Sequence, residues 1–437
     1  MQCLIIAAGR GSRLRALGEV KPLVPLLGVP LLERVIRSLQ SAGVDRFVVV
    51  TGYEGDRVET FLQRLAERLG TEILCVRNEA WEKENGVSVL RAREALGEEP
   101  FLLSMADHLF DPAIARVLLA AGHGPDEVLL AVDPNLSNPL VDMEDVTRVA
   151  CDQKGNIRAI GKGLERFDGF DTGVFLCTPA IFDALERSCR EQGDSTLSGA
   201  IRVLAAEGKA RGIPIDRFWI DVDDERAFRK AEEALLEQTR GKGNDGPVSR
   251  WLNRPLSIRL SRWLVRYDVT PNQISLFSFL LSLLAACLFA VGGYVALALG
   301  GLIAQLASVI DGSDGEVARL KYLSSDYGGW FDAVLDRYAD AFLLFGLTWH
   351  VYQETHTPLS LVAGFLAIIG SFMVSYTADK YDQRMKERIG KGFRIGRDIR
   401  VFLIFVGAVL DQPLPLLVAI ALLMNGETVR RLVICRE

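Results

Sequence analysis

The sequence lacks the cysteine patterns of disulfide-stapled and zinc-binding proteins. Its seven cysteines are scattered along the chain, and no two of them form a C-x-x-C pair. A disulfide framework in a small secreted protein uses an even set of cysteines, and a structural zinc site uses closely spaced ligands. We therefore expect reduced thiols in an intracellular protein.

The sequence also lacks a general excess of positive charge and a signal peptide. Residues 1–249 carry 31 Lys and Arg against 40 Asp and Glu, and residues 250–437 carry 19 against 16. This balance excludes a polybasic nucleic-acid-binding protein. The apolar run at residues 4–8 is too short, and too soon followed by glycine, to be the core of a signal peptide. We expect it to be the first strand of a functional domain.

Length and hydrophobic patterning divide the chain into two domains. With 437 residues, the chain is longer than the roughly 100–200 residues of a typical single domain. In residues 1–237, short β-rich runs alternate with helical patterns, which predicts a doubly wound α/β domain. Residues 238–248 are rich in Gly, Asn and Asp, as linkers are. Residues 249–437 form the second predicted domain.

The second predicted domain consists mainly of long apolar runs. Six runs, near residues 274–291, 295–310, 341–352, 359–377, 401–410 and 413–424, predict an all-α domain of six transmembrane helices. Basic residues gather in 250–272 and 379–400 and are absent from the intervening turns. By the positive-inside rule, we expect both termini to face the cytoplasm, at the cell (inner) membrane.

A basic and aromatic segment precedes the first apolar run. Within residues 249–267, Trp and Leu alternate with Arg at near-helical spacing. This pattern predicts an amphipathic helix that lies on an anionic membrane face. The alternative is a plain connecting helix with a solvated charged side.

A loop with two glycines follows the first predicted strand. Gly9 and Gly11 would let the backbone approach phosphates, and Arg13 and Lys21 would supply positive charge. The two glycines alone fit a tight strand-to-helix turn equally well. The whole pattern, A-A-G-x-G-x-R-L followed by Lys21-Pro22-Leu23, resembles the signature of the sugar-phosphate nucleotidyltransferases. The resemblance spans about residues 1–230.

This resemblance implies a nucleoside triphosphate site and a divalent metal site. Asp107 after a central strand, and Asp221 or Asp223 in the motif W-x-D-x-D, correspond to metal ligands, and the choice between the last two stays open. Arg13 and Lys21 would act in catalysis. The other nucleotide contacts implied are Ala7, Ala8, Gly9, Gly11, Asn78, Asn85 and Ser88.

Two further residues match the acceptor contacts of these nucleotidyltransferases. They are Lys162 and Asp171, for which a solvated lysine and a turn residue are the alternatives. His108, next to Asp107, is expected to be a surface histidine rather than a ligand.

Four aspartates recur at helical spacing in the second domain. Asp311 and Asp314, and then Asp332 and Asp336, are three or four residues apart, so each pair lies on one helix face. Uncompensated ionised carboxylates at membrane depth cost on the order of several kcal/mol each, and divalent cations are their natural compensation. The spacing therefore predicts a site for two metal ions.

The surrounding residues complete the motif D-x-x-D-G-x-x-A-R-x8-G-x3-D-x3-D, which resembles the CDP-alcohol phosphotransferases over about residues 250–437. The resemblance implies that Gly315, Ala318 and Arg319 cradle a CDP group. It also implies that Asp336 is the base on an acceptor hydroxyl. Three arginines follow at every third residue: Arg394, Arg397 and Arg400. They would suit an acceptor phosphate, and they are also consistent with basic residues that flank a transmembrane helix on its cytoplasmic side.

The two domains form a logical pair, because a cytidylyltransferase makes a CDP-linked compound and a CDP-alcohol phosphotransferase consumes one. Their order resembles a family of bifunctional enzymes that make CDP-inositol from CTP and inositol 1-phosphate. These enzymes then transfer phosphoinositol to a second inositol 1-phosphate and release CMP. The resemblance implies Mg²⁺ or Mn²⁺ in both domains, a membrane environment, and a homodimer formed through the membrane domain.

Two alternatives remain open from the sequence. The first is a pair of activities that uses phosphocholine, or another polar head phosphate, with a lipid alcohol as acceptor. A choline site would use an aromatic cage, and only Trp81 stands near the predicted acceptor loop. The second is a first domain that binds a nucleotide sugar only for regulation; retention of the catalytic motif residues weighs against it.

Overall fold

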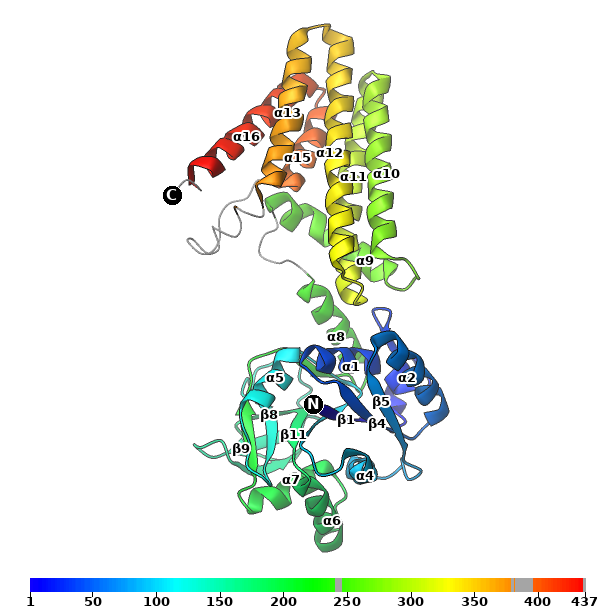
Figure 1. Cartoon of the computed structure of the whole chain (residues 1–437), viewed down its shortest axis with the longest axis vertical. Helices are drawn as coiled ribbons and strands as arrows, with labels where there is room; N and C mark the ends of the chain where they lie inside the picture. The colour runs from blue at the N-terminus through cyan, green and yellow to red at the C-terminus, as the bar shows by residue number, and fades with distance from the viewer. Residues whose placement is uncertain (240–245, 379–380, 382–395, 435–437) are drawn as a thin grey trace. The chain divides into compact units, whose positions relative to one another are not determined.

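A computed structural model describes residues 1–239, 246–378, 381 and 396–434. The chain folds as two compact units, Met1–Ala234 and Leu235–Glu437 (Figure 1). Strands are confined to the first unit within the described residues, and the second unit is helical. The predicted linker at 238–248 falls partly outside the described part of the chain, so its extent stays a prediction.

The first unit is built on a nine-stranded mixed sheet. Its parallel part has the order β6 (Phe101–Met105), β1 (Gln2–Ala7), β4 (Arg46–Thr51), β5 (Glu72–Arg77). β1 and β4 are almost continuously apolar because both faces of a central parallel strand are covered. The predicted α/β fold is confirmed, and the sheet is mixed because β11 (Gly169–Cys177) pairs antiparallel with β6.

The remaining strands extend the sheet beyond β11 or form small ribbons. β8 and β9 both pair with β11, β12 pairs with β8, and β10 pairs with β9. Their bounds are β8 (Val128–Asp133), β9 (Arg148–Cys151), β10 (Ile157–Gly161) and β12 (Ala210–Pro214), with ribbons β2 (Pro25–Leu26) and β3 (Val29–Pro30), and β7 (His108–Phe110) and β13 (Trp219–Asp221).

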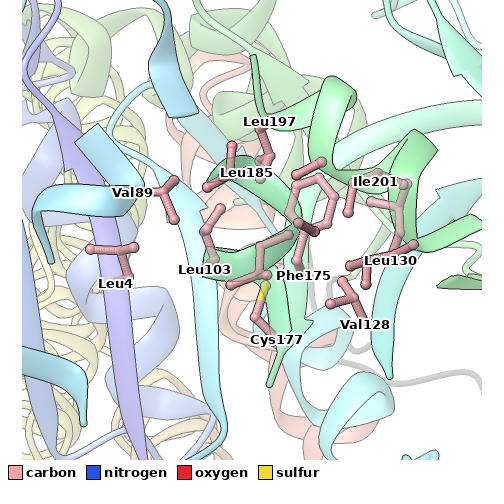
Figure 2. Packing of buried hydrophobic residues seen from close by; sticks show 14 of the residues in the cluster. Leu4, Val89, Leu103, Val128, Leu130, Phe175, Cys177, Leu185, Leu197 and Ile201 are labelled. Carbon is pink, nitrogen blue, oxygen red and sulfur yellow. The ribbon is translucent and has the colours of Figure 1, made fainter. Parts of the chain in front are cut away.

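The helices of the first unit bury apolar side chains against the sheet. Figure 2 shows one such core, in which Leu103 and Phe175 from neighbouring strands meet Leu185 and Ile201 from two helices. The helices are α1 (Leu31–Ser41), α2 (Gly55–Leu69), α3 (Asn85–Arg91), α4 (Arg93–Leu96), α5 (Pro112–Ala120), α6 (Ala180–Gln192), α7 (Leu197–Ala206) and α8 (Glu225–Gln238), with short 3-10 turns at Ser12–Leu14 and Lys21–Leu23.

The second unit is a bundle of long helices (Figure 1). α10 packs against α11 and α12, α13 packs against α12 and α16, and α15 packs against α11. Their bounds are α10 (Pro271–Val291), α11 (Tyr294–Leu320), α12 (Asp326–Thr355), α13 (Pro358–Tyr376), α15 (Arg397–Val409) and α16 (Pro413–Ile434), preceded by a π-helical turn at Ser249–Asn253 and α9 (Arg254–Leu264).

Three of these helices, α10, α11 and α13, are long and apolar enough to cross a membrane. α12, α15 and α16 cover the other three predicted runs, and the count of six spans stays a prediction. Small residues allow close helix packing: a Cβ added at Gly346 of α12 would meet the backbone of Ala286 in α10 at 2.5 Å. The described bundle core therefore depends on close backbone approach as well as on apolar side chains.

Local signals set the start of the first long helix. Thr270 accepts a hydrogen bond from the Gln273 backbone N–H, and the Gln273 side chain accepts one from the Thr270 N–H at 2.9 Å. Pro271 occupies the first turn, where its missing N–H costs no helical hydrogen bond. This capping box fixes where the chain enters α10.

Candidate active sites

A cavity of about 670 Å³ opens in the first unit. This volume suits a nucleotide-sized ligand, since ligand sites in proteins usually measure about 300–1,000 Å³. Among the residues predicted from sequence, it is lined by Ala8, Gly9, Arg13, Lys21, Asn85, Ser88, Asp107, Lys162, Asp171, Asp221 and Asp223. Ala7, Gly11 and Asn78 lie outside this lining, although Asn78 donates to the Ser88 hydroxyl at 3.0 Å and so supports the wall.

Strand pairing brings two of the predicted metal ligands together. Asp107 follows β6 directly, and β13 pairs antiparallel with β7 so that Asp221 stands opposite His108. Lys21 Nζ lies 2.5 Å from Asp107 Oδ2. His108 Nδ1 lies 3.0 Å from Asp107 Oδ1 and 3.8 Å from Asp221 Oδ1. Residues from three distant parts of the chain thus form one charged cluster.

The donor set of this cluster suits a hard divalent cation. Ligand atoms of Asp107, His108 and Asp221 lie within 4.8 Å of one another. Asp221 Oδ1 is buried and has no hydrogen-bond partner within the described structure, as expected of an oxygen that a cation would satisfy. Carboxylate oxygens are the ligands that Mg²⁺ prefers. These residues fit the predicted metal site.

Charge and burial shift the pKa values of this cluster. Burial opposes ionisation of Asp107, but the positive charges of Lys21 and His108 overcome it and hold the Asp107 pKa well below its usual value. Burial alone would lower the pKa of His108, yet Asp221 and Asp107 raise it to about 9. Burial raises the pKa of Asp221. The prediction that His108 is a surface histidine is wrong, because β7 carries its ring into the cavity.

A second group of charges lies in the same cavity around Asp145. Arg13 Nη1 contacts Asp145 Oδ2 and Asp223 Oδ2, both at 2.8 Å. Lys162 contacts the other oxygen of Asp145. Asp145 is not among the residues predicted from sequence, because no motif marks the loop that carries it. Lys162 is therefore ion-paired rather than merely solvated.

Asp171 combines the two interpretations that its sequence allowed. Its Oδ1 accepts the Gly173 backbone N–H at 2.8 Å, which is a turn contact, and its side chain also lines the cavity. Burial raises the pKa of Asp171 to about 6. Gly173 has φ +73°, and a Cβ there would overlap the His108 ring, so this position requires glycine.

In the second unit, the predicted carboxylates converge between α11 and α12. Ligand atoms of Asp311, Asp314 and Asp332 lie within 4.8 Å of one another. Ser278 donates to Asp311 at 2.8 Å and Ser275 donates to Asp314 at 2.5 Å, so α10 orients both carboxylates. Asp332 Oδ1 is buried without a hydrogen-bond partner within the described residues. This donor set also fits divalent cations.

Arg397 of α15 joins the carboxylate cluster. Its Nη1 lies 2.7 Å from Asp311 and 2.6 Å from Asp336, and its Nε lies 3.2 Å from Asp340. Arg400 is 2% exposed and pairs with Asp340 at 2.5 Å. Arg400 thus contacts a buried carboxylate in this structure, and its role at an acceptor stays a prediction. Arg394 lies outside the described residues.

Asp340 was not among the predicted site residues. It continues the four-residue ladder of Asp332 and Asp336 by one helical turn, and that spacing is the signal by which it could have been found. The predicted CDP contacts Gly315, Ala318 and Arg319 lie on the last turns of α11, beyond Asp314. A Cβ at Gly315 would come within 3.2 Å of the Arg319 guanidinium.

Two family models match the chain, one in each unit. A model described as MobA-like NTP transferase domain matches residues 3–193, and one described as CDP-alcohol phosphatidyltransferase matches residues 268–428. The second match contains all four predicted metal ligands of the helical unit and both described arginines of α15.

Curated relatives match over nearly the whole length. A bifunctional IPC transferase and DIPP synthase from Rubrobacter xylanophilus is 38% identical over 98% of this chain and 95% of its own length. A protein of the same description from Aquifex aeolicus is 34% identical over 97% of this chain and 95% of its own. Among solved structures, an inositol-1-phosphate CTP transferase from T. maritima is 25% identical with a TM-score of 0.47, covering 55% of this chain and 96% of that one.

Proposed function

The chain belongs to the family of bifunctional IPC transferases and DIPP synthases, and we propose that its two units catalyse successive reactions. It is an enzyme with a nucleotidyltransferase unit and a CDP-alcohol phosphotransferase unit. The first makes CDP-inositol and pyrophosphate from CTP and inositol 1-phosphate. The second transfers phosphoinositol from CDP-inositol to another inositol 1-phosphate and releases CMP.

The observation that carries this proposal is the presence of two carboxylate clusters on one chain whose relatives match it from end to end. One cluster lines a cavity that also holds Arg13, Lys21 and Lys162. The other lies between two helices that are matched by the CDP-alcohol phosphatidyltransferase model. Either unit considered alone would be compatible with a wider range of substrates. The similarity to relatives over the full length supports the combination of the two reactions.

In the first reaction, a phosphate oxygen of inositol 1-phosphate attacks the α-phosphorus of CTP and pyrophosphate leaves. Lys21 and Arg13 neutralise negative charge on the triphosphate, and Lys162 binds the acceptor phosphate. A divalent ion held by Asp107 with Asp221 or Asp223 would supply further neutralisation of the phosphates. The remaining contribution of the protein is to position two anionic substrates that repel each other.

In the second reaction, an acceptor hydroxyl attacks the β-phosphorus of CDP-inositol and CMP leaves. Asp336 accepts the hydroxyl proton, and Gly315, Ala318 and Arg319 hold the CDP group. Arg397 lies between Asp311 and Asp336 and places positive charge beside the reacting phosphate. Divalent ions held by Asp311, Asp314, Asp332 and Asp336 would stabilise charge on the diphosphate.

The finer features of the proposal concern the membrane. The helical unit crosses the bilayer six times, both termini and both active sites face the cytoplasm, and the membrane unit forms a homodimer. Mg²⁺ serves both sites, with Mn²⁺ as a substitute. The basic residues of 250–272 support this orientation.

Phosphorus NMR of the purified full-length protein tests the proposal. The sample contains labelled CTP, Mg²⁺ and inositol 1-phosphate. We expect pyrophosphate first, then CMP together with a phosphodiester that contains two inositols. Pyrophosphate without CMP would show that the second acceptor is a lipid or another alcohol. If neither pyrophosphate nor CMP forms, the inositol assignment is contradicted, and phosphocholine is the next substrate to assay.

A further inference from the structure

Asp145 links the nucleotide side of the first cavity to its acceptor side. One carboxylate oxygen contacts Arg13, which follows the glycine loop after β1, and the other contacts Lys162, which follows β10. The two cations come from segments that are far apart in the sequence. A single carboxylate thus holds both, with one oxygen for each, as a bridging phosphate group would.

The loop that carries Asp145 forms a wall of the cavity. Every residue from Leu140 to Thr147 contributes to the lining. The loop is anchored on both sides, because Lys230 donates to the Pro139 carbonyl at 2.6 Å and Arg148 donates to the Met143 carbonyl at 3.1 Å. The position of Asp145 is therefore set by the fold.

Solvent reaches both ends of this bridge. The side chains of Arg13 and Lys162 are 59% and 61% exposed, so solvent screens both ion pairs and weakens them. A phosphate monoester carries close to two negative charges and three acceptor oxygens, whereas a carboxylate carries one charge and two oxygens. Arg13 also contacts Asp223, at 2.8 Å, so Asp145 is not its only carboxylate partner.

We propose that Asp145 is a specificity-determining residue that occupies the phosphate position between Arg13 and Lys162 until a phosphorylated substrate displaces it. An uncharged polyol lacks the charge to compete with the carboxylate. A phosphate monoester takes over both cations, which brings the acceptor phosphate beside the triphosphate. This inference rests on the proposed function of the first unit and adds a residue that selects for the phosphate group.

Calorimetric titration of the full-length protein with inorganic phosphate, and then with pyrophosphate, tests the inference. We expect Asp145→Asn to bind these anions about 3- to 10-fold more tightly than the unmodified protein, because the carboxylate that bridges Arg13 and Lys162 is removed and only the contact of Arg13 with Asp223 remains. The KM for inositol 1-phosphate should fall by a similar factor, while kcat for pyrophosphate release does not rise. Asp145→Glu, which restores a carboxylate, should return the affinity toward the original value.

Glu165→Gln is the matched control, because it removes one negative charge from an exposed position three residues from Lys162 that lies outside the lining of the cavity. We expect anion affinity to be unchanged in this variant. Unchanged or weaker anion binding by Asp145→Asn, with an unaltered circular dichroism spectrum, would overturn the inference. If Asp145→Asn unfolds, Asp145→Ser serves as the second variant with the same expected gain.

The anion titration also separates this inference from the proposed function. If the unmodified protein forms no CDP-inositol, the assignment of CTP and inositol 1-phosphate fails. The comparison of phosphate affinities between Asp145→Asn and Glu165→Gln still decides whether Asp145 competes with anions, because it requires no reaction.

Discussion

At the residue scale, the two aspartates of the W-x-D-x-D motif differ in their partners. Asp223 pairs with Arg13 at 2.8 Å, whereas Asp221 faces His108 and has one buried oxygen without a hydrogen bond in the described structure. Burial raises the pKa of both carboxyls, that of Asp223 to about 6. An oxygen left without a partner in a charged cavity is the better cation ligand, so the geometry favours Asp221.

This difference leads to a ranked prediction for the first reaction. Asp221→Asn should lower kcat/KM for pyrophosphate release by about 100-fold or more, because loss of a direct metal ligand exceeds the effect of a supporting residue. Asp223→Asn should cost about 10-fold through the displaced Arg13. Pyrophosphate assays on both full-length variants measure the ratio. A larger loss in Asp223→Asn would assign the metal to Asp223 instead.

For the second reaction, the corresponding prediction concerns Asp332, whose Oδ1 is buried without a hydrogen-bond partner in the described residues. Asp332→Asn should reduce CMP release from supplied CDP-inositol by about 100-fold or more while leaving pyrophosphate release unchanged. Asp326→Asn is the matched control, because Asp326 is exposed in the first turn of the same helix. Equal losses in the two variants would mean that Asp332 has no special role.

At the element scale, α9 is attached to α11 by a buried polar contact. Glu316 is fully buried and accepts from Ser257 at 2.7 Å, Ser261 at 2.6 Å and Arg254 at 2.8 Å. All three donors belong to α9, and Glu316 lies within the predicted metal-binding motif of α11. The contact thus ties the amphipathic helix to the segment that carries Asp311 and Asp314.

Replacing Glu316 should therefore loosen the helical unit. Glu316→Gln should lower its stability by about 2–4 kcal/mol, because charge-assisted hydrogen bonds are lost between the buried Glu316 and the partly buried Arg254. Ser261→Ala removes one donor and should cost about 1 kcal/mol. Thermal unfolding of both variants in the same detergent measures the difference. If the two variants unfold at the same temperature, Glu316 is not the main attachment of α9.

At the scale of the whole molecule, the two carboxylate clusters lie in separate compact units. Each cluster contains basic side chains and one buried carboxylate oxygen that has no hydrogen-bond partner within the described residues. The chemistry requires only that CDP-inositol formed in the first unit reaches the second. If CDP-inositol is released into solution, one chain can therefore form it and another chain can consume it.

Mixing two inactive variants tests this arrangement. Asp107→Asn should release no pyrophosphate, and Asp311→Asn should release no CMP, yet a mixture of the two full-length proteins should form the inositol phosphodiester from CTP and inositol 1-phosphate. Removal of free CDP-inositol from the mixture should abolish formation of the inositol phosphodiester. Failure of the mixture, with each remaining activity intact, would show that the intermediate does not pass between chains.

Features that depend on local spacing can be predicted from the amino-acid sequence. The four-residue ladder of Asp332 and Asp336 requires only helical periodicity to lie on one face, and the apolar runs specify buried strands and long helices through composition alone. Cluster residues such as Asp107 and Asp221 were found through motifs, although nothing local indicated which of the paired acids in W-x-D-x-D has a free oxygen.

Contacts between residues that are distant in the sequence are visible only in the folded chain. Pairing of β7 with β13 carries His108 into the cavity, against the expectation of a surface histidine. Asp145 pairs with basic side chains that are 17 and 132 residues away in the sequence. Asp340 pairs with two arginines that are 57 and 60 residues away. The physical reason is that ion pairs are specified by chain topology over long separations, whereas sequence patterns record only neighbours along a strand or helix.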